Sequence, residues 1–378
     1  MNAPSRRERP ALYRLPLLAL GFIALIVGTG AGLARLGWPM PDLAASAAAL
    51  HGPLMITGFF GVVIALERAV AIGRPWAYLG PLGAGLGTLL ALSIGLRAGA
   101  WLNVVGALVL LAATVDVFRR QRALFTFTLV MGALAFVVGC VLWARGGAVH
   151  EVVPWWLAFL VLTIAGERLE LSRFRPPSAR ASQVFAGILC AIVLALVSGQ
   201  FDATVAWSIR LFAAALLVLA VWLVKQDIAR RTVRSQGLTR FIAVCLLSGY
   251  AWLATGGAVM FAAGNLTPGA ASYGAALHAL LLGFVFSMVF GHAPIIFPAV
   301  LRVAVPYHAS FYLPLVLLHL SLLLRLAGDA AAEHVWLRVG GLFNAIALAA
   351  FIVSTVLAVL RGKRQGPLAR PSAGLPSR

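Results

Sequence analysis

Apolar stretches of about 20 residues follow one another along almost the whole of this 378-residue chain. An α-helix rises 1.5 Å per residue, so about 20 apolar residues cross the roughly 30 Å of hydrocarbon in a bilayer. Windows of about 19 residues place twelve such stretches, at residues 15–36, 48–72, 77–96, 98–118, 123–144, 152–172, 183–200, 203–224, 240–263, 271–298, 308–327 and 336–360. The sequence therefore predicts an all-α, polytopic integral membrane protein of about twelve transmembrane helices.

The composition excludes an ordinary soluble enzyme. Hydrophobic residues make up 62% of the chain and charged residues only 11%, whereas soluble proteins carry roughly 25% charged residues. The three cysteines, Cys140, Cys190 and Cys245, each lie inside an apolar stretch and form no CxxC pair. We interpret them as packing residues rather than as disulfide partners or metal ligands.

The formal net charge of +19 is explained by membrane topology. Basic residues gather on one side of the predicted spans, at the N-terminus, Arg74, Arg119 to Arg122, Arg173 to Arg180, Lys225 to Arg240, Arg302 and Arg361 to Arg364. The positive-inside rule places this side in the cytoplasm, together with both termini, in a bacterial-type inner (plasma) membrane. Membrane lipid is the expected partner. Nucleic acid is not, because no basic domain lies outside the predicted spans.

The predicted domain organisation is simple. Residues 1–14 form a basic cytoplasmic N-terminus, and residues 15–361 form a single membrane domain with a cytoplasmic linker near 225–239. The first span is too long for the apolar part of a secretory signal and is expected to be retained. Residues 362–378, rich in Pro, Ser and Arg, are expected to be a disordered cytoplasmic tail.

One short motif occurs twice. Ile64-Ala65-Leu66-Glu67-Arg68 returns one hundred residues later as Ile164-Ala165-Gly166-Glu167-Arg168. The two copies close the second and sixth spans, which indicates either a parallel repeat of four helices or chance in an Ala/Leu-rich chain. Glu67 and Glu167 either pair locally with the neighbouring arginines at helix ends or belong to a proton path.

Three histidines are predicted at one depth in the outer third of the membrane: His51, His278 and His319. Neutral imidazoles ligate haem iron or a transition metal without a counter-charge in low dielectric. No carboxylate is close to them in sequence, which disfavours a hydrated hard cation. The alternative is three unrelated histidines that hydrogen-bond to neighbouring groups.

The remaining histidines lie elsewhere. His292 follows His278 by fourteen residues, about 21 Å along a helix axis, which places it near the cytoplasm. With His308 it forms a second metal site, a quinone contact or an interface pair. His150 and His334 are expected to be solvated in outer loops. No catalytic residue is assigned.

These residues resemble a known superfamily. The second span, with His51-Gly52-Pro53-Leu54-Met55 and Phe59-Phe60, resembles the second helix of haem-copper oxidase subunit I, whose His-Gly-x-x-Met pattern supplies a low-spin haem ligand. The run from His278-Ala279-Leu280 to Gly291-His292 resembles the NnrS family, membrane proteins associated with haem, copper and defence against nitric oxide. The resemblance implies three four-helix repeats, a haem ligand at His51 and a second ligand in the region of His278.

The chain departs from the oxidases at the copper site. That site needs a histidine within helix six and consecutive histidines in helix seven, whereas the sixth span here has only His150 before its start and the seventh has none. Oxygen reduction at a haem-copper pair is therefore not expected. His278 stands in His-Ala-Leu rather than in the oxidase His-x-His, so a second haem on that helix is not expected either.

The leading hypothesis is a membrane protein with a b-type haem between His51 and His278. His319 is then an alternative ligand or a nearby copper ligand. Two axial imidazoles favour electron transfer with a quinone or another redox partner, and a single one leaves a position open for nitric oxide. Two other hypotheses remain: a secondary transporter with helices broken at Pro294 and Pro298, and an assembly factor for a respiratory complex.

Overall fold

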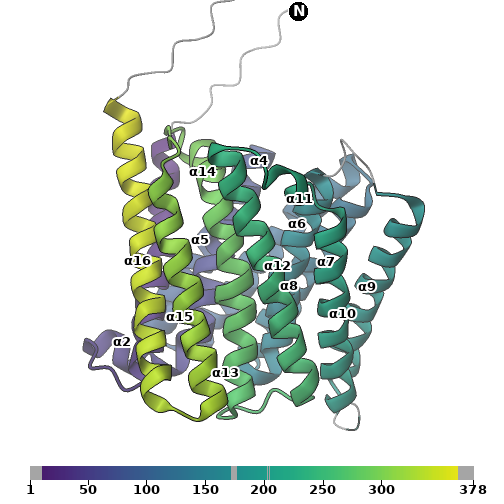
Figure 1. Ribbon diagram of the computed structural model, residues 1–378, viewed down its shortest axis with the longest axis vertical. Coiled ribbons are helices and arrows are strands. Elements are labelled where there is room, and N and C mark those ends of the chain that lie inside the picture. The colour runs from purple at the N-terminus through teal and green to yellow at the C-terminus, as the bar shows by residue number, and fades with distance from the viewer. Residues whose placement is uncertain (1–10, 172–176, 202, 204, 365–378) are drawn as a thin grey trace, which may run out of the picture.

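The computed structural model describes residues 11–171, 177–201, 203 and 205–364. Within these ranges every regular element is a helix, and the long helices stand side by side in one bundle (Figure 1). Eleven helices in this part of the chain are long and apolar enough to cross a membrane. The prediction of an all-α polytopic membrane protein is confirmed.

Nine of the twelve helices of the bundle are continuous in the described residues: α1 (Leu15–Arg35), α5 (Leu79–Ser93), α6 (Leu96–Arg120), α7 (Leu124–Ala144), α8 (Val149–Leu171), α9 (Ala179–Ser198), α10 (Val205–Gln226), α12 (Gly237–Ala263) and α16 (His334–Arg364). The others are assembled from shorter pieces. The second span joins η2 (Ala48–Leu50), α3 (His51–Pro53), η3 (Leu54–Phe60) and α4 (Gly61–Ile72), the tenth joins α13 (Ala271–His278), η7 (Ala279–Phe286) and α14 (Ser287–Leu301), and the eleventh joins η8 (Ala309–Phe311) and α15 (Tyr312–Ala331). Short helices η1 (Ala11–Arg14), α2 (Asp42–Ser46), η4 (Pro75–Tyr78) and α11 (Ala229–Thr232) lie at the ends.

The third predicted span is the short member of the bundle. It appears as α5, which has 15 residues, whereas a membrane span needs about 20. The twelve predicted spans therefore correspond to eleven long helices and the shorter α5. Its glycines let it pack directly on α6. A Cβ at Gly87 would lie 2.8 Å from the backbone nitrogen of Asn103, and a Cβ at Gly106 would lie 2.7 Å from that of Ala84.

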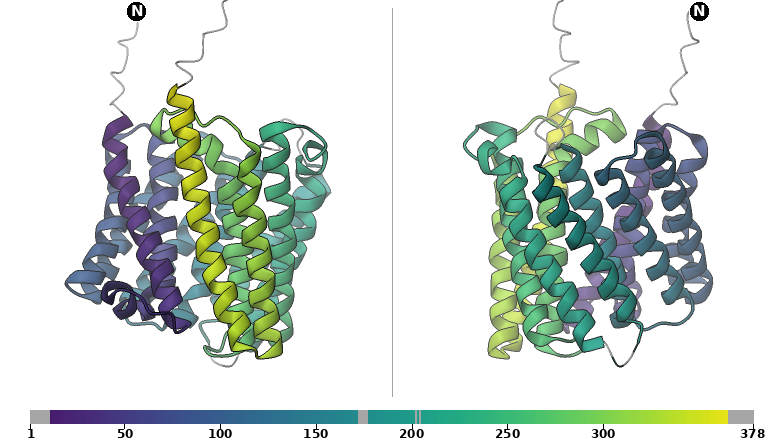
Figure 2. Two further views of the ribbon diagram at one scale, coloured as in Figure 1. Left: turned by 60° about the vertical axis from the view of Figure 1, so that its left-hand side comes forward. Right: turned by 90° about the vertical axis from the view of Figure 1, so that its right-hand side faces the viewer.

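The two ends of the bundle differ in charge. The first turn of α1 and the last turn of α16 lie at the same end (Figure 2), where the Arg14 guanidinium donates to the carbonyl of Val300 at 2.7 Å. We call this the basic end, because it also carries Arg74, Arg120 and Arg240. The other end is called the opposite end. That the basic end faces the cytoplasm follows from charge alone and stays a prediction.

The predicted linker near 225–239 is partly built into the bundle. It contains α11, and Asp227 within it is buried, at 9% exposure. At the C-terminus, α16 continues to Arg364, beyond the predicted end of the membrane domain at residue 361. The rest of the predicted tail and residues 1–10 lie outside the described residues.

Candidate functional site

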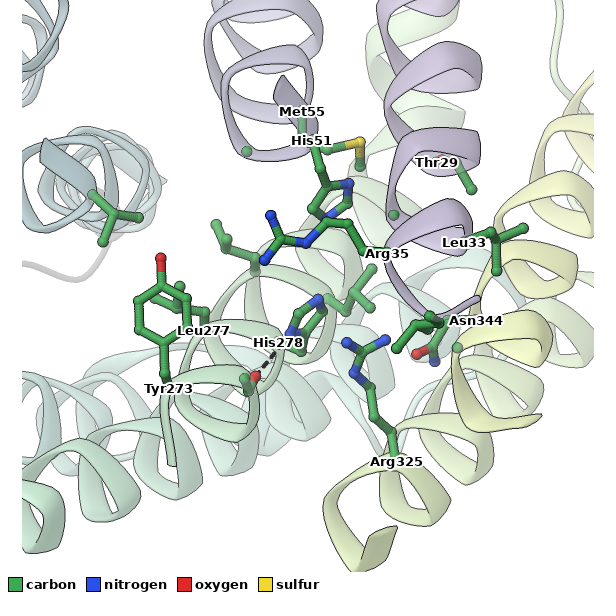
Figure 3. Close-up of a pocket in the computed structure, with 18 of the residues that line it drawn as sticks. Thr29, Leu33, Arg35, His51, Met55, Tyr273, Leu277, His278, Arg325 and Asn344 are labelled. Atoms are coloured by element: carbon green, nitrogen blue, oxygen red, sulfur yellow. Dashed lines mark hydrogen bonds between the residues drawn. The ribbon is translucent and has the colours of Figure 1, made fainter. Parts of the chain in front are cut away.

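A cavity of about 500 Å³ lies at the opposite end of the bundle (Figure 3). The end of α1, the start of the second span, the first turn of α8, α13 with η7, α15 and α16 all contribute to its wall. The polar side chains in that wall include His51, His150 and His278, with Arg35 and Arg325 beside them. Two of the three histidines predicted to share a site are therefore brought together.

His51 is the first residue of α3. Pro53 stands in this first turn, where a missing backbone N–H costs little. The imidazole points toward α1, and its Nδ1 lies 2.7 Å from the carbonyl oxygen of Gly28. Gly32 makes room for the ring, because a Cβ there would lie 2.8 Å from His51 Cε1.

His278 is the last residue of α13. Its Nδ1 lies 2.7 Å from the carbonyl oxygen of Gly274, one turn earlier in the same helix. A carbonyl only accepts a hydrogen bond, so Nδ1 carries the proton in both His51 and His278, and each Nε2 keeps its lone pair. Among the described residues, neither Nε2 atom has a hydrogen-bond partner.

The two imidazoles face each other across the cavity (Figure 3). Their ring centroids are 6.3 Å apart, and the angle between the ring planes is 13°. Two imidazoles that bind one metal from opposite sides, each through a metal–nitrogen bond of about 2.0–2.1 Å, have their centroids roughly 6 Å apart. The arrangement therefore suits a metal centre with two axial imidazole ligands.

A π-helix follows each of these histidines. η3 begins at Leu54, three residues after His51, and η7 begins at Ala279, directly after His278. The two π-helices meet through aromatic rings: Phe286 stacks on Phe59 at 5.8 Å and contacts Phe60 edge-on at 5.2 Å. Such segments are frequent at functional sites, and the helical period of the sequence gave no sign of them.

The wall formed by α15 and α16 carries polar atoms without partners in the described part of the chain. These are Nε of Arg325, Oδ2 of Asp329 and Oδ1 of Asn344. Asn344 is 4% exposed, and its amide group donates to Ser321 Oγ at 2.6 Å. This bond fixes the amide and leaves its oxygen free. A buried polar atom without a hydrogen-bond partner destabilises the fold. A polar group that enters the cavity would find hydrogen-bond partners on this wall.

Sequence reasoning missed one histidine of the cavity. His150, expected to be solvated in an outer loop, lies in the first turn of α8 and is half-buried in the cavity wall. The sequence held one indication of this position: His150 lies at the start of a predicted span, on the same side of the membrane as His51.

His319 does not line the cavity. It is on α15, and both of its ring nitrogens are used by α12: the indole N–H of Trp252 donates to Nδ1 at 3.0 Å, and Nε2 lies 3.1 Å from Ser248 Oγ. Because Nδ1 accepts, the proton is on Nε2, which donates to Ser248. No lone pair of this ring is left for a metal in this arrangement.

His292 lies near the basic end, in a buried polar network. Its Nδ1 donates to the carbonyl of Met288 at 2.7 Å, and its Nε2 accepts from Arg168 Nη1 at 3.0 Å. Arg168 also donates from Nε to Asp227 Oδ2 at 2.8 Å, and the Tyr250 hydroxyl donates to the same oxygen at 2.5 Å. His308, sixteen residues further along the chain, bonds locally to Ser310. These contacts do not bring His292 and His308 together.

Glu67 and Glu167, the acidic residues of the repeated motif, lie close enough for their charges to interact. Among the described residues, neither forms an ion pair or a hydrogen bond. No group of three or more His, Cys, Asp or Glu side chains that suits a metal ion occurs in the described ranges. The pair His51 and His278 thus remains the candidate site.

Comparison with known proteins gives a family without a described activity. The family model described as "Domain of unknown function (DUF8744)" matches residues 14–360, so the chain belongs to this family. No curated protein matches the chain. The match covers every residue that lines the cavity.

Proposed function

We propose that this DUF8744 protein binds a b-type haem between His51 and His278 and transfers electrons through it within the membrane. The observation that carries the proposal is the pair of opposed imidazoles, 6.3 Å apart between centroids. Both rings are held through Nδ1 by backbone carbonyls, at 2.7 Å each. Ligand histidines commonly donate their second ring N–H in this way, which fixes the ring and raises its basicity.

The residues around the imidazoles fit such a group. The volume of the cavity, about 500 Å³, is in the ordinary range for a cofactor pocket. Met55, Phe60 and Phe286 would supply apolar surface for a porphyrin, and Arg35 and Arg325 would supply guanidinium groups for its two carboxylates. Arginine suits carboxylates because its N–H groups form parallel pairs of hydrogen bonds.

A bound haem would supply a one-electron redox centre. His51 and His278 would each contribute a neutral Nε2, so these two ligands would add no charge of their own to the low-dielectric interior. If both imidazoles held the haem iron, electron transfer would be favoured over binding of nitric oxide. The partner in this scheme is a quinone or another redox protein of the membrane. Copper has no part in it, because both ring nitrogens of His319 are engaged.

The proposed setting is a bacterial-type inner membrane with both termini in the cytoplasm. The excess of arginine at the basic end supports this orientation through the positive-inside rule. The cavity, at the opposite end, then opens toward the outer side of the membrane.

An optical spectrum of the purified protein tests the proposal. Protein from haem-replete cells should show a Soret band, and reduction should sharpen the visible bands of a low-spin b-type haem. His51→Ala and His278→Ala should each abolish or strongly weaken the Soret band. His334→Ala, which changes an exposed histidine at the start of α16, is the matched control and should leave it unchanged. A colourless wild-type protein contradicts the proposal.

A secondary transporter is the second candidate. The observation that favours it is the wall of unpartnered polar atoms at Arg325, Asp329 and Asn344, which would suit a small polar substrate. The same spectrum separates the two functions, since a transporter carries no chromophore. In that event, binding of candidate polar solutes should be lost in Asn344→Leu, while Asn103→Leu, on α6 outside the cavity, should still bind them.

A further inference from the structure

We propose that His319 and Trp252 are positioning residues, which hold the π-helix η7 in place and thereby set the direction of the His278 imidazole. This inference rests on the proposed haem site. It assigns a role to His319 that differs from metal ligation.

The first step is the fixing of Trp252. Its indole N–H donates to His319 Nδ1 at 3.0 Å, and His319 Nε2 donates to Ser248 Oγ at 3.1 Å. Ser248 is one turn before Trp252 on α12, so the histidine bridges two positions of that helix from α15. The indole and imidazole planes are 29° apart, with centroids 6.2 Å from each other. Trp252 is 8% exposed. The indole therefore has one defined orientation.

The second step is the contact between Trp252 and η7. The indole lies against the backbone of Gly283, where a Cβ would overlap its Cβ, Cγ and Cδ2 atoms. Gly283 is the fifth residue of η7. A π-helix carries an extra residue per turn and is rare as a free structure, so it persists where packing holds it. The indole on Gly283 supplies such packing.

The third step connects η7 with the site. His278 directly precedes η7. If the π-helix relaxed to an α-helix, the register would change by one residue, which turns a side chain by about 100° around the helix axis. The bond from His278 Nδ1 to Gly274 moves with α13 and cannot prevent this. The indole on Gly283 therefore keeps the imidazole directed at His51.

Electron paramagnetic resonance of the oxidised protein tests this role. The signal of a low-spin ferric haem depends on the angle between its two axial imidazole planes, which is 13° between the free rings here. The wild type should give the rhombic spectrum of near-parallel planes. His319→Leu and Trp252→Phe should keep the haem but shift the signal toward the large-angle type or broaden it. The phenylalanine keeps an aromatic ring beside Gly283, but it is smaller than the indole and has no N–H donor for His319.

His319→Gln is the conservative control. Its amide oxygen can accept from Trp252 and its amide nitrogen can donate to Ser248, so it should restore the wild-type spectrum. Unchanged spectra in both His319→Leu and Trp252→Phe, at full haem content, overturn the positioning role. If His319→Leu fails to fold, Trp252→Phe decides alone. Absence of haem from the wild type contradicts the proposed function itself.

Discussion

Arg168 on α8 donates to Asp227, 59 residues along the chain, at 2.8 Å, and only 7% of the arginine and 9% of the aspartate is exposed. The second carboxylate oxygen of Asp227 accepts from the backbone N–H of Ala229 at 2.8 Å, and the Tyr250 hydroxyl donates to Oδ2. This network joins α8, the segment after α10, and α12. Loss of one partner leaves a buried charge without compensation.

We expect Asp227→Ala to destabilise the protein by about 3–5 kcal/mol, the usual effect of breaking a buried ion pair. The thermal unfolding midpoint in detergent, followed by tryptophan fluorescence, measures this. Asp116→Ala is the matched control. It removes the partner of Arg120 at 2.6 Å, but the arginine is 51% exposed, so the loss should stay below about 1 kcal/mol. Equal losses in the two variants contradict the prediction.

Gly32→Ala should lower the haem content of the purified protein without unfolding it. The added Cβ would lie 2.8 Å from His51 Cε1, so the imidazole has to leave its place beside Gly28. The ratio of Soret to protein absorbance measures the effect. Gly187→Ala is the control: no atom lies within 4 Å of its Cβ, and alanine at a helical position stabilises by roughly 0.5–1 kcal/mol. A normal Soret ratio in Gly32→Ala would speak against His51 as a ligand.

Arg325→Gln should lower the midpoint potential of the proposed haem by tens of millivolts. A positive charge near the metal favours the reduced state, because reduction adds an electron, and its removal favours the oxidised state. Redox titration of the reduced absorbance band measures the shift. Arg210→Gln removes a charge at the same end of the bundle, but Arg210 does not line the cavity, and its effect should be much smaller. A rise in potential in Arg325→Gln is incompatible with this account.

Cysteine labelling should establish the orientation. In a Cys190→Ala background, since Cys140 and Cys245 are buried, we expect a membrane-impermeant maleimide to label Arg145→Cys on intact cells from outside. Gln121→Cys, at the basic end, should react only after the membrane is opened. Both positions are exposed in the turns that flank α7. The reverse pattern would invert the proposed topology.

The positions of most spans could be predicted from the sequence, since they depend on hydropathy. The direction in which each side chain points around its helix axis could not be predicted. His278 and His319 were expected at one depth, but one faces the cavity and the other faces Trp252 on α12. Two π-helices shift the register within two spans, and a uniform helical period does not reveal such a shift.

Long-range partners were also beyond the sequence. Asp227 appeared as part of a polar linker, yet its charge is neutralised by Arg168 inside the bundle. Residues that meet through packing of distant helices, such as Arg325 and Asn344 with His278, carry no signal in their local neighbourhood. A polar residue in an apolar stretch predicts that it has a hydrogen-bond or ion-pair partner, but not which residue that partner is.

The short helix α5 has a consequence for the surrounding lipid. Its 15 residues span about 22 Å at 1.5 Å per residue, and the four residues of η4 directly before it add about 8 Å, so the two together only just reach the roughly 30 Å of an average hydrocarbon layer. Leu79 and Leu86 on this helix are exposed, at 53% and 41%, so acyl chains contact it directly. The span of η4 and α5 therefore matches an average hydrocarbon layer without residues to spare. In a thicker bilayer, the lipid beside this helix should thin first, at a cost of fractions of a kcal/mol per Å of mismatch.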